Sequence, residues 1–205
     1  MLKRQQKGLS IVELMITISL GLLLMAALTA VFANTLGVNA RSLKLSQLQE
    51  EATAIMDLMV GDLRRTGYRG DAAALIYDPT NASVAFNDTI VIGNYAGEEL
   101  NSCILFSYDA DSDGVHDGAS EAFGYRVVAG RIQRRQSSAG CTATGWQNLT
   151  TNEMIEVTDL DFTLTEQMFS LVNEQQVTVV LQVAMPEDND INRVLATEVV
   201  IRNAF

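Results

Sequence analysis

Lys7-Gly8-Leu9-Ser10-Ile11-Val12-Glu13 opens an apolar run that continues to Leu36 and decides where the chain resides. Within it, Leu14 to Ala33 contains no charged residue and no proline, and its apolar side chains are interrupted only by three hydroxyl residues and a glycine. A helix needs about 20 apolar residues to cross the hydrocarbon core of a bilayer. The sequence therefore predicts a membrane-spanning helix with one carboxylate, Glu13, inside its apolar entrance.

Gly8 followed by Leu9-Ser10-Ile11-Val12-Glu13 resembles the class III signal of type IV pilins and type II secretion pseudopilins. The resemblance implies that residues 1–8 are a cytoplasmic leader, that prepilin peptidase cuts between Gly8 and Leu9, and that the new amine of Leu9 is methylated. Residues 9–36 would then form a transmembrane and polymerisation helix. Glu13 becomes the fifth mature residue, which in this family is thought to meet the N-terminal amine of a neighbouring subunit. The family most often has Phe where this chain has Leu9.

Three cations precede the apolar run, at Lys3, Arg4 and Lys7. By the positive-inside rule they predict a cytoplasmic amino end in the inner membrane and a periplasmic head over residues 37–205. Two simpler interpretations are a secretory signal cleaved after a small residue such as Ala30, and a plain single-span anchor. Neither explains Gly8 and Glu13 together.

The helix is expected to continue beyond the membrane to about residue 65. Apolar residues recur there at spacings of three and four, which predicts one apolar stripe that packs on a sheet. The acidic residues of this segment are expected mostly to face water, and Thr66-Gly67 supplies a C-terminal stop. The stripe consists of Leu45, Leu48, Ala52, Ile55, Met59 and Leu63, and the acids are Glu50, Glu51, Asp57 and Asp62.

After the helix, residues 66–102 read as a connection with little regular structure apart from a short strand at Thr89–Ile92. From residue 103 to residue 205 the pattern is that of strands with short turns, including a hairpin that turns at Ala129-Gly130. Consecutive strands with short connections predict one antiparallel sheet, so the fold class is α+β and pilin-like. The expected strands are Cys103–Tyr108, Phe123–Val128, Arg131–Arg135, Met154–Thr165, Val177–Met185 and Val194–Ile201.

The formal net charge of −11 argues against nucleic acid as a partner of the head by itself. The two cysteines, Cys103 and Cys141, fall in the segment expected to be periplasmic, where disulfides persist. Their even number favours one bridge, and two free buried thiols are the alternative. A bridge would close a loop of about 40 residues, which stabilises a chain by roughly 3 to 4 kcal/mol.

The acidic stretch between the first two strands of the expected sheet has the spacing of a calcium loop. Carboxylates occupy the first, third, fifth and ninth positions, with a glycine at the sixth and a backbone carbonyl at the seventh. The twelfth position holds Ser120 rather than a glutamate, with Glu121 one residue further on. The alternative is a solvated acidic turn without Ca²⁺. The candidate ligands are Asp109, Asp111, Asp113, Val115 and Asp117.

Enzyme chemistry has little support, because the only histidine, His116, lies inside this acidic stretch and is expected to be exposed. Arg65-Thr66-Gly67-Tyr68, Phe123-Gly124-Tyr125-Arg126 and Trp146 resemble minor pilins of the PilW type. That resemblance implies a subunit that joins other minor and major pilins and primes pilus assembly near the tip. A GspJ-like minor pseudopilin of a type II secretion system and a membrane-anchored calcium-binding adhesin module are the alternatives.

Overall fold

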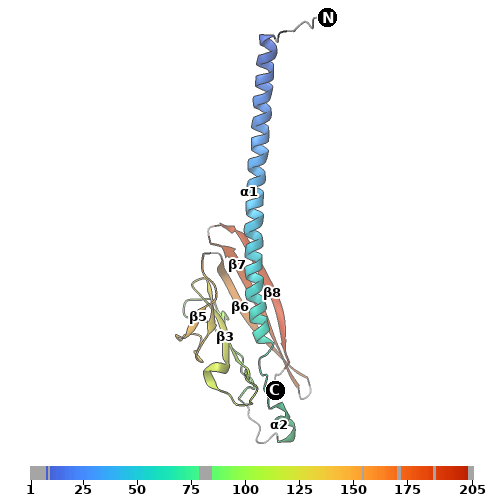
Figure 1. Ribbon diagram of the computed structural model, residues 1–205. Helices are drawn as coiled ribbons and strands as arrows, with labels where there is room; N and C mark the ends of the chain where they lie inside the picture. The colour runs from blue at the N-terminus through green and yellow to red at the C-terminus, as the bar shows by residue number, and fades with distance from the viewer. Residues whose placement is uncertain are drawn as a thin grey trace. The chain divides into compact units, whose positions relative to one another are not determined.

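The structure is a computed structural model that describes residues 8, 10–78, 85–153, 155–169, 172–186 and 188–202. It contains one long N-terminal helix followed by antiparallel strands, which confirms the α+β, pilin-like fold (Figure 1). Contacts divide the chain into two compact units, 1–44 and 45–205, which are described separately. The predicted leader charges and Leu9 lie outside the described residues.

Helix α1 (Ile11–Leu63) contains 53 residues and no proline, and it ends close to the predicted point. Its last turn tightens, because the N–H groups of Arg65 and Thr66 donate to the carbonyls three residues earlier. Gly67 has a positive φ of 73° and ends the turn, as expected of a glycine at a helix C-terminus.

Within the second unit, the apolar stripe of α1 is buried as predicted. Ala52, Met59 and Leu63 have no exposed surface, and Leu45 is partly buried at the start of the stripe. These residues belong to a single core with apolar side chains from two sheets. The other buried stripe residues of α1 are Leu48 and Ile55, and Met56 and Val60 widen the buried face.

Asp62 does not face water, contrary to the prediction. It is 7% exposed, and its Oδ2 accepts a hydrogen bond from the Tyr125 hydroxyl at 2.5 Å. Arg134 lies 3.4 Å from the same oxygen. Burial, followed by the contact with Asp62, raises the pKa of Tyr125, so the phenol remains a donor. The polar contact thus fixes the end of α1 to two strands.

The strands form two sheets rather than the single sheet expected from the sequence. The first has the order β1-β2-β3-β4-β5 and is antiparallel throughout. Ala129 and Gly130 have positive φ angles of 50° and 71°, as in a two-residue type I′ turn, which confirms the predicted hairpin. Its strands are β1 (Val91–Gly93), β2 (Cys103–Ser107), β3 (Ala122–Val128), β4 (Arg131–Arg135) and β5 (Trp146–Asn148).

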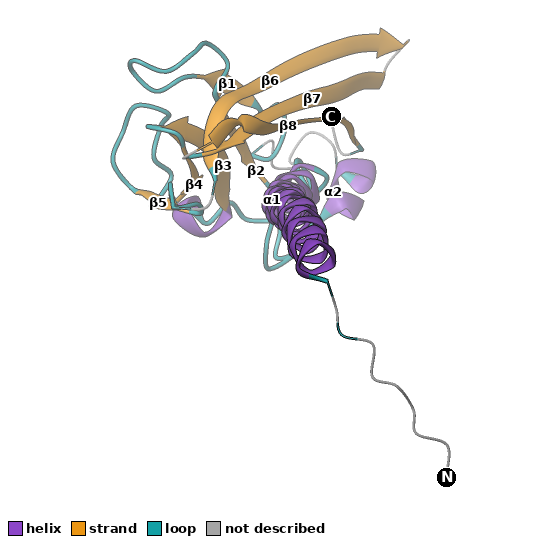
Figure 2. Cartoon of the chain, turned by 90° about the horizontal axis from the view of Figure 1, so that it is seen from above, coloured by secondary structure: helices purple, strands orange, loops and turns teal. Residues whose placement is uncertain are grey.

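The second sheet has the order β6-β7-β8 and is also antiparallel. Figure 2 shows β6 and β7 as a long hairpin. The alternation of the sequence predicts strands, but it carries no information on which strands share a sheet, so it does not predict the division into two sheets. The strands are β6 (Glu156–Phe169), β7 (Val172–Met185) and β8 (Asp188–Ile201), each of 14 residues.

The connection after α1 contains a short helix, α2 (Ala72–Tyr77), where the sequence predicts little regular structure. Three consecutive alanines favour helix, but six residues are too few to display a helical period. A single 3₁₀ turn, η1 (Gly118–Glu121), follows the acidic loop and leads into β3.

Candidate functional site

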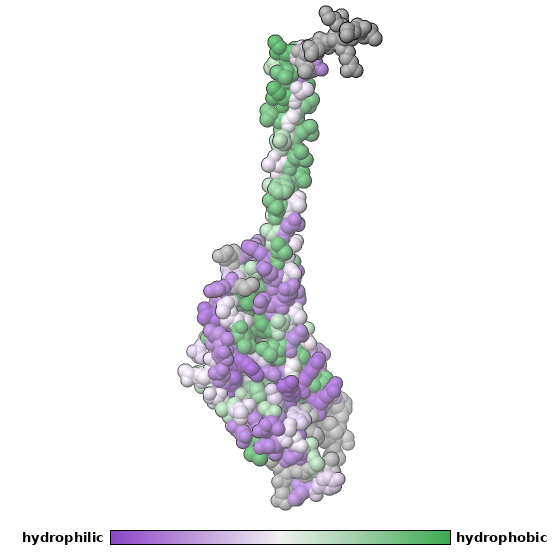
Figure 3. Space-filling view, viewed as in Figure 1, coloured by the Kyte–Doolittle hydropathy of each residue, from purple (hydrophilic) through white to green (hydrophobic). Residues whose placement is uncertain are grey.

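In the first unit, the apolar side chains of α1 are exposed. Every large apolar side chain from Ile11 to Val38 is between 52% and 78% exposed, and Figure 3 shows this surface in green. An exposed apolar surface of this extent indicates lipid or partner contact. Among the described residues α1 is the one helix that is long and apolar enough to cross a membrane, judged by length and composition.

The hydroxyl side chains within this apolar segment are satisfied by the helix itself. The hydroxyl of Thr17 donates to the Leu14 carbonyl at 2.9 Å, and that of Ser19 donates to the Met15 carbonyl at 2.5 Å. The Thr29 hydroxyl likewise donates to the Met25 carbonyl. Because lipid offers no hydrogen-bond partners, this pairing suits the segment to a bilayer.

Glu13 lies in the first turn of α1 and is exposed. A carboxylate suits a helix N-terminus, where the helix dipole is positive. Gly8 is exposed and precedes the helix, and its predicted cleavage partner Leu9 lies outside the described residues. The exposed Glu13 carboxylate forms no ion pair with another described residue.

Asp109, the first predicted calcium ligand, is buried and already engaged. It is 1% exposed, its Oδ2 accepts hydrogen bonds from the N–H groups of Gly70 and Gly114 at 2.8 Å, and its Oδ1 accepts one from Ser112 at 2.6 Å. Burial acts to raise the pKa of Asp109, but the backbone N–H groups outweigh it and hold that pKa below its usual value. Asp109 is therefore an ionised anchor of the loop.

The turn after α1 interlocks with the acidic loop through this anchor. Besides the Gly70 N–H contact, the Asp109 N–H donates to the Tyr68 carbonyl at 2.9 Å. A Cβ added at Gly70 would lie 2.2 Å from the carbonyl oxygen of Ser112, so no larger residue fits there without movement. The Arg69 guanidinium pairs with Asp71 at 2.7 and 2.8 Å, and this contact lowers the pKa of Asp71.

The remaining predicted ligands lie at the surface. Carboxylate oxygens of Asp111, Asp113 and Asp117 lie within 4.8 Å of one another, and all three residues are exposed. The N–H of Val115, which is 58% exposed, donates to Asp113 at 2.7 Å. The structure therefore gathers three of the four predicted carboxylates, while Asp109 belongs to a second, overlapping group.

The second group contains a residue that the loop template did not include. Oxygens of Asp109, Asp111 and Glu121 lie within 4.8 Å of one another. Glu121 is 1% exposed and accepts hydrogen bonds from the N–H groups of Ala110 and Asp117, both at 2.8 Å. In the sequence, the only indication that Glu121 joins this group is its place one residue beyond the twelfth position. The η1 turn is needed to bring its side chain back toward the loop.

His116 is half-buried rather than exposed, contrary to the prediction. Its ring centroid lies 5.3 Å from that of Phe86, and its Nδ1 accepts a hydrogen bond from the Gly118 N–H. The histidine thus packs the acidic loop against the segment before β1.

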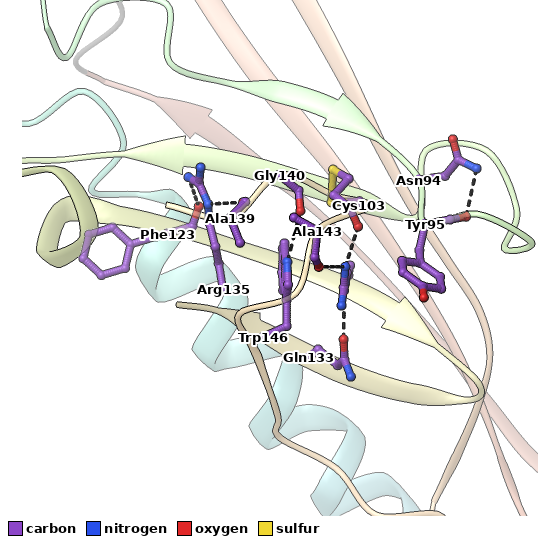
Figure 4. Close-up of a disulfide and its surroundings, with 12 residues drawn as sticks. Asn94, Tyr95, Cys103, Phe123, Gln133, Arg135, Ala139, Gly140, Ala143 and Trp146 are labelled. Atoms are coloured by element: carbon purple, nitrogen blue, oxygen red, sulfur yellow. Dashed lines mark hydrogen bonds between the residues drawn. A yellow bond between two sulfur atoms is a disulfide. The ribbon is translucent and has the colours of Figure 1, made fainter. Parts of the chain in front are cut away.

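Cys103 and Cys141 form the predicted disulfide, with their Cα atoms 6.0 Å apart. Figure 4 shows the bridge and the hydrogen bonds around it. Beside it, the Arg126 guanidinium lies 4.7 Å from the ring of Tyr95 and 4.4 Å from that of Trp146, and it donates to the Cys141 and Ala143 carbonyls. Burial lowers the pKa of Arg126. The bridge therefore orders the loop whose carbonyls satisfy this buried cation.

An uncovered apolar helix that begins with an acidic first turn and continues into an antiparallel head defines a type IV pilin-like protein. The family description "Prokaryotic N-terminal methylation motif" matches residues 3–29, the segment that contains Gly8 and Glu13. The chain belongs to the family described as prepilin peptidase-dependent protein B, which matches residues 41–201. No curated protein and no solved structure matches it.

These matches agree with the class III signal and with processing by prepilin peptidase. They also fit anchoring in a membrane through α1 and contact with other pilins, since subunits of this class are structural.

Proposed function

We propose that the chain is a minor pilin of a type IV pilus, of the PilW type, which joins other minor pilins near the tip and primes assembly. The observation that carries the proposal is Glu13, placed in the first turn of an apolar helix that the chain leaves uncovered. A carboxylate near the bilayer face is costly without a partner, and the methylated amine of a neighbour's Leu9 would supply the opposite charge.

The route to the fibre follows from the same segment. Lys3, Arg4 and Lys7 would hold the amino end in the cytoplasm while the head enters the periplasm, with the cut after Gly8. The helix then leaves the inner membrane for the fibre, where the apolar surfaces of other pilins replace lipid. The head would then meet neighbouring heads.

Glu13→Ala should leave cleavage after Gly8 and methylation of Leu9 intact but reduce surface pili about tenfold or more, because losing one partner of a buried ion pair costs about 3 kcal/mol or more. Mass spectrometry of the membrane-purified protein reports the N-terminus, and electron microscopy of sheared pili reports assembly. Glu50→Ala is the control, because Glu50 is an exposed acid of the same helix in the second unit.

Undisturbed pilus growth in the Glu13→Ala strain would contradict the proposal. A membrane-anchored adhesin should tolerate that substitution, because it need not polymerise. A strain that lacks the chain and loses type II secretion instead of pili would establish the GspJ-like pseudopilin.

We also propose that the acidic loop binds Ca²⁺. The two overlapping carboxylate groups, which share Asp111, support this proposal, because Ca²⁺ takes six to eight oxygens. Asp111 would supply a carboxylate together with Asp113 and Asp117 or with Asp109 and Glu121, and the Val115 carbonyl is the further predicted ligand. A bound cation would relieve repulsion among the exposed acids and rigidify the loop.

Ca²⁺ at about ten times its dissociation constant should raise the Tm of the full-length protein in detergent by about 3 to 5 °C. The double variant Asp111→Ala with Asp113→Ala should lose this rise, because it removes exposed ligands without touching the buried anchor. Glu50→Ala with Glu51→Ala removes two exposed acids elsewhere and should retain it. An unchanged Tm for the parent protein with Ca²⁺ would disprove the site.

A further inference from the structure

Strand β8 is a long edge strand whose second half lacks the usual protection. It pairs only with β7, and among the described residues no other backbone hydrogen bond reaches it. Its second half, Val194–Ile201, contains one charge, Glu198, and no proline. Natural edge strands are normally blunted by charge, proline, bulges or a covering segment.

The other edge of the same sheet is covered by the head itself. On β6, the N–H of Phe162 donates to the Asn101 carbonyl at 3.0 Å, and the N–H of Val157 donates to the Gly130 carbonyl at 2.9 Å. The contrast between the two edges suggests that a partner covers β8.

A groove of about 450 Å³ runs beside the end of β8 and carries positive charge in an acidic protein. It is lined by Arg64, just after α1, by Arg202, just after β8, and by Glu198–Val200. Neither arginine forms an ion pair with another described residue, whereas Glu198 accepts a hydrogen bond from Gln176 at 2.7 Å. The groove therefore offers two cations to an acidic ligand.

The outward side chains of β8 add apolar contact area beside this edge. Val194 is 60% exposed and Val200 is 46% exposed, with exposed Ala196 between them. Side chains alternate along a strand, so these three residues lie on one face. An added strand could align its own alternate side chains with this row.

We propose that β8 binds an extended acidic segment of a different pilin-like subunit, which adds a fourth strand to the β6-β7-β8 sheet. Main-chain hydrogen bonds would give the affinity, and a carboxylate between Arg64 and Arg202 would set the register. That the partner is a pilin-like subunit rests on the proposed function. The binding edge itself rests on the geometry of β8.

The full-length chain in its native strain provides the test. A benzophenone amino acid placed at Val194 or Val200 should crosslink to an acidic segment of another subunit that carries a class III signal, identified by mass spectrometry of the crosslinked peptide. The same probe at Thr163, an exposed residue of β6, is the control and should not crosslink to that segment.

Arg64→Gln with Arg202→Gln should reduce the crosslink about fivefold, as expected for two exposed ion pairs. Arg131→Gln removes an exposed arginine of β4 and should leave it unchanged. A crosslink no stronger than at Thr163, one to a second copy of this chain, or one insensitive to the arginine changes would overturn the inference. Counting pili on a strain that lacks the chain tests the proposed function separately. A failure of the proposed function can therefore be told from a failure of the β8 inference.

Discussion

Asp109→Ala should destabilise the head by about 3 to 5 kcal/mol, because it removes a buried charged acceptor and leaves one buried and two part-buried backbone N–H groups without it. These are the N–H groups of Gly70, Ser112 and Gly114. They belong to the turn after α1 and to the acidic loop. The substitution should therefore loosen both segments and the contact between them. Urea unfolding of the full-length protein in detergent, followed by circular dichroism, measures the change.

Two control variants separate the anchoring role of Asp109 from its charge. Asp109→Asn keeps one acceptor oxygen and should lose less stability than alanine. Asp111→Ala removes an exposed carboxylate of the same loop and should change stability by less than about 0.5 kcal/mol. Equal stability of Asp109→Ala and the parent protein would contradict the assigned role.

The same anchor predicts a pH dependence. The pKa of Asp109 is lower in the folded chain than the ordinary value of about 3.9 that applies after unfolding. Its contribution to stability is therefore complete above the unfolded pKa and is lost as the pH falls through the folded pKa. The stability difference between the parent protein and Asp109→Ala should consequently narrow between about pH 5 and pH 2.

The elements predicted correctly are those whose signals are local. The stripe from Leu48 to Leu63 has a helical period, and Gly130 suits the second central position of a two-residue hairpin turn. Gly67 ends α1 as expected, because a glycine accepts the positive φ that this stop requires. Each feature is determined by a few neighbouring residues, so the sequence alone is sufficient.

The failures concern contacts between distant segments. The sequence predicts Asp62 at the surface because it is an acidic residue outside the apolar stripe, whereas Tyr125, 63 residues later, gives it a buried partner. Glu121 joins the metal-binding candidates only because η1 redirects the chain. Likewise, the division into two sheets depends on which strands pair, and strand alternation carries no information about that choice.

The disulfide pairing is predictable from the sequence, because two cysteines allow only one intramolecular bridge. Its position beside Arg126 was not predictable, since the rings of Tyr95 and Trp146 lie about 30 and 20 residues away on different segments. Because Arg126 contacts the loop that the bridge holds, the bridge also stabilises the folded chain, in addition to restricting the unfolded one.

The double variant Cys103→Ser with Cys141→Ser should lower the free energy of unfolding by about 3 to 4 kcal/mol. The bridge joins residues 38 apart, and its loss restores the entropy of that loop in the unfolded chain. A folded-state cost is expected in addition, because Arg126 relies on the Cys141 and Ala143 carbonyls in this loop. A buried cation that loses acceptors is costly.

A reducing agent supplies the matched control for this prediction. Dithiothreitol should lower the stability of the parent protein to that of the serine variant and should leave the serine variant unchanged, as measured by urea unfolding. Peptide mapping without reduction should recover Cys103 linked to Cys141, and free thiols at both positions would refute the bridge. If the serine variant is less stable than the reduced parent protein, the difference reports the packing of the sulfur atoms, because the loop entropy is restored equally in both.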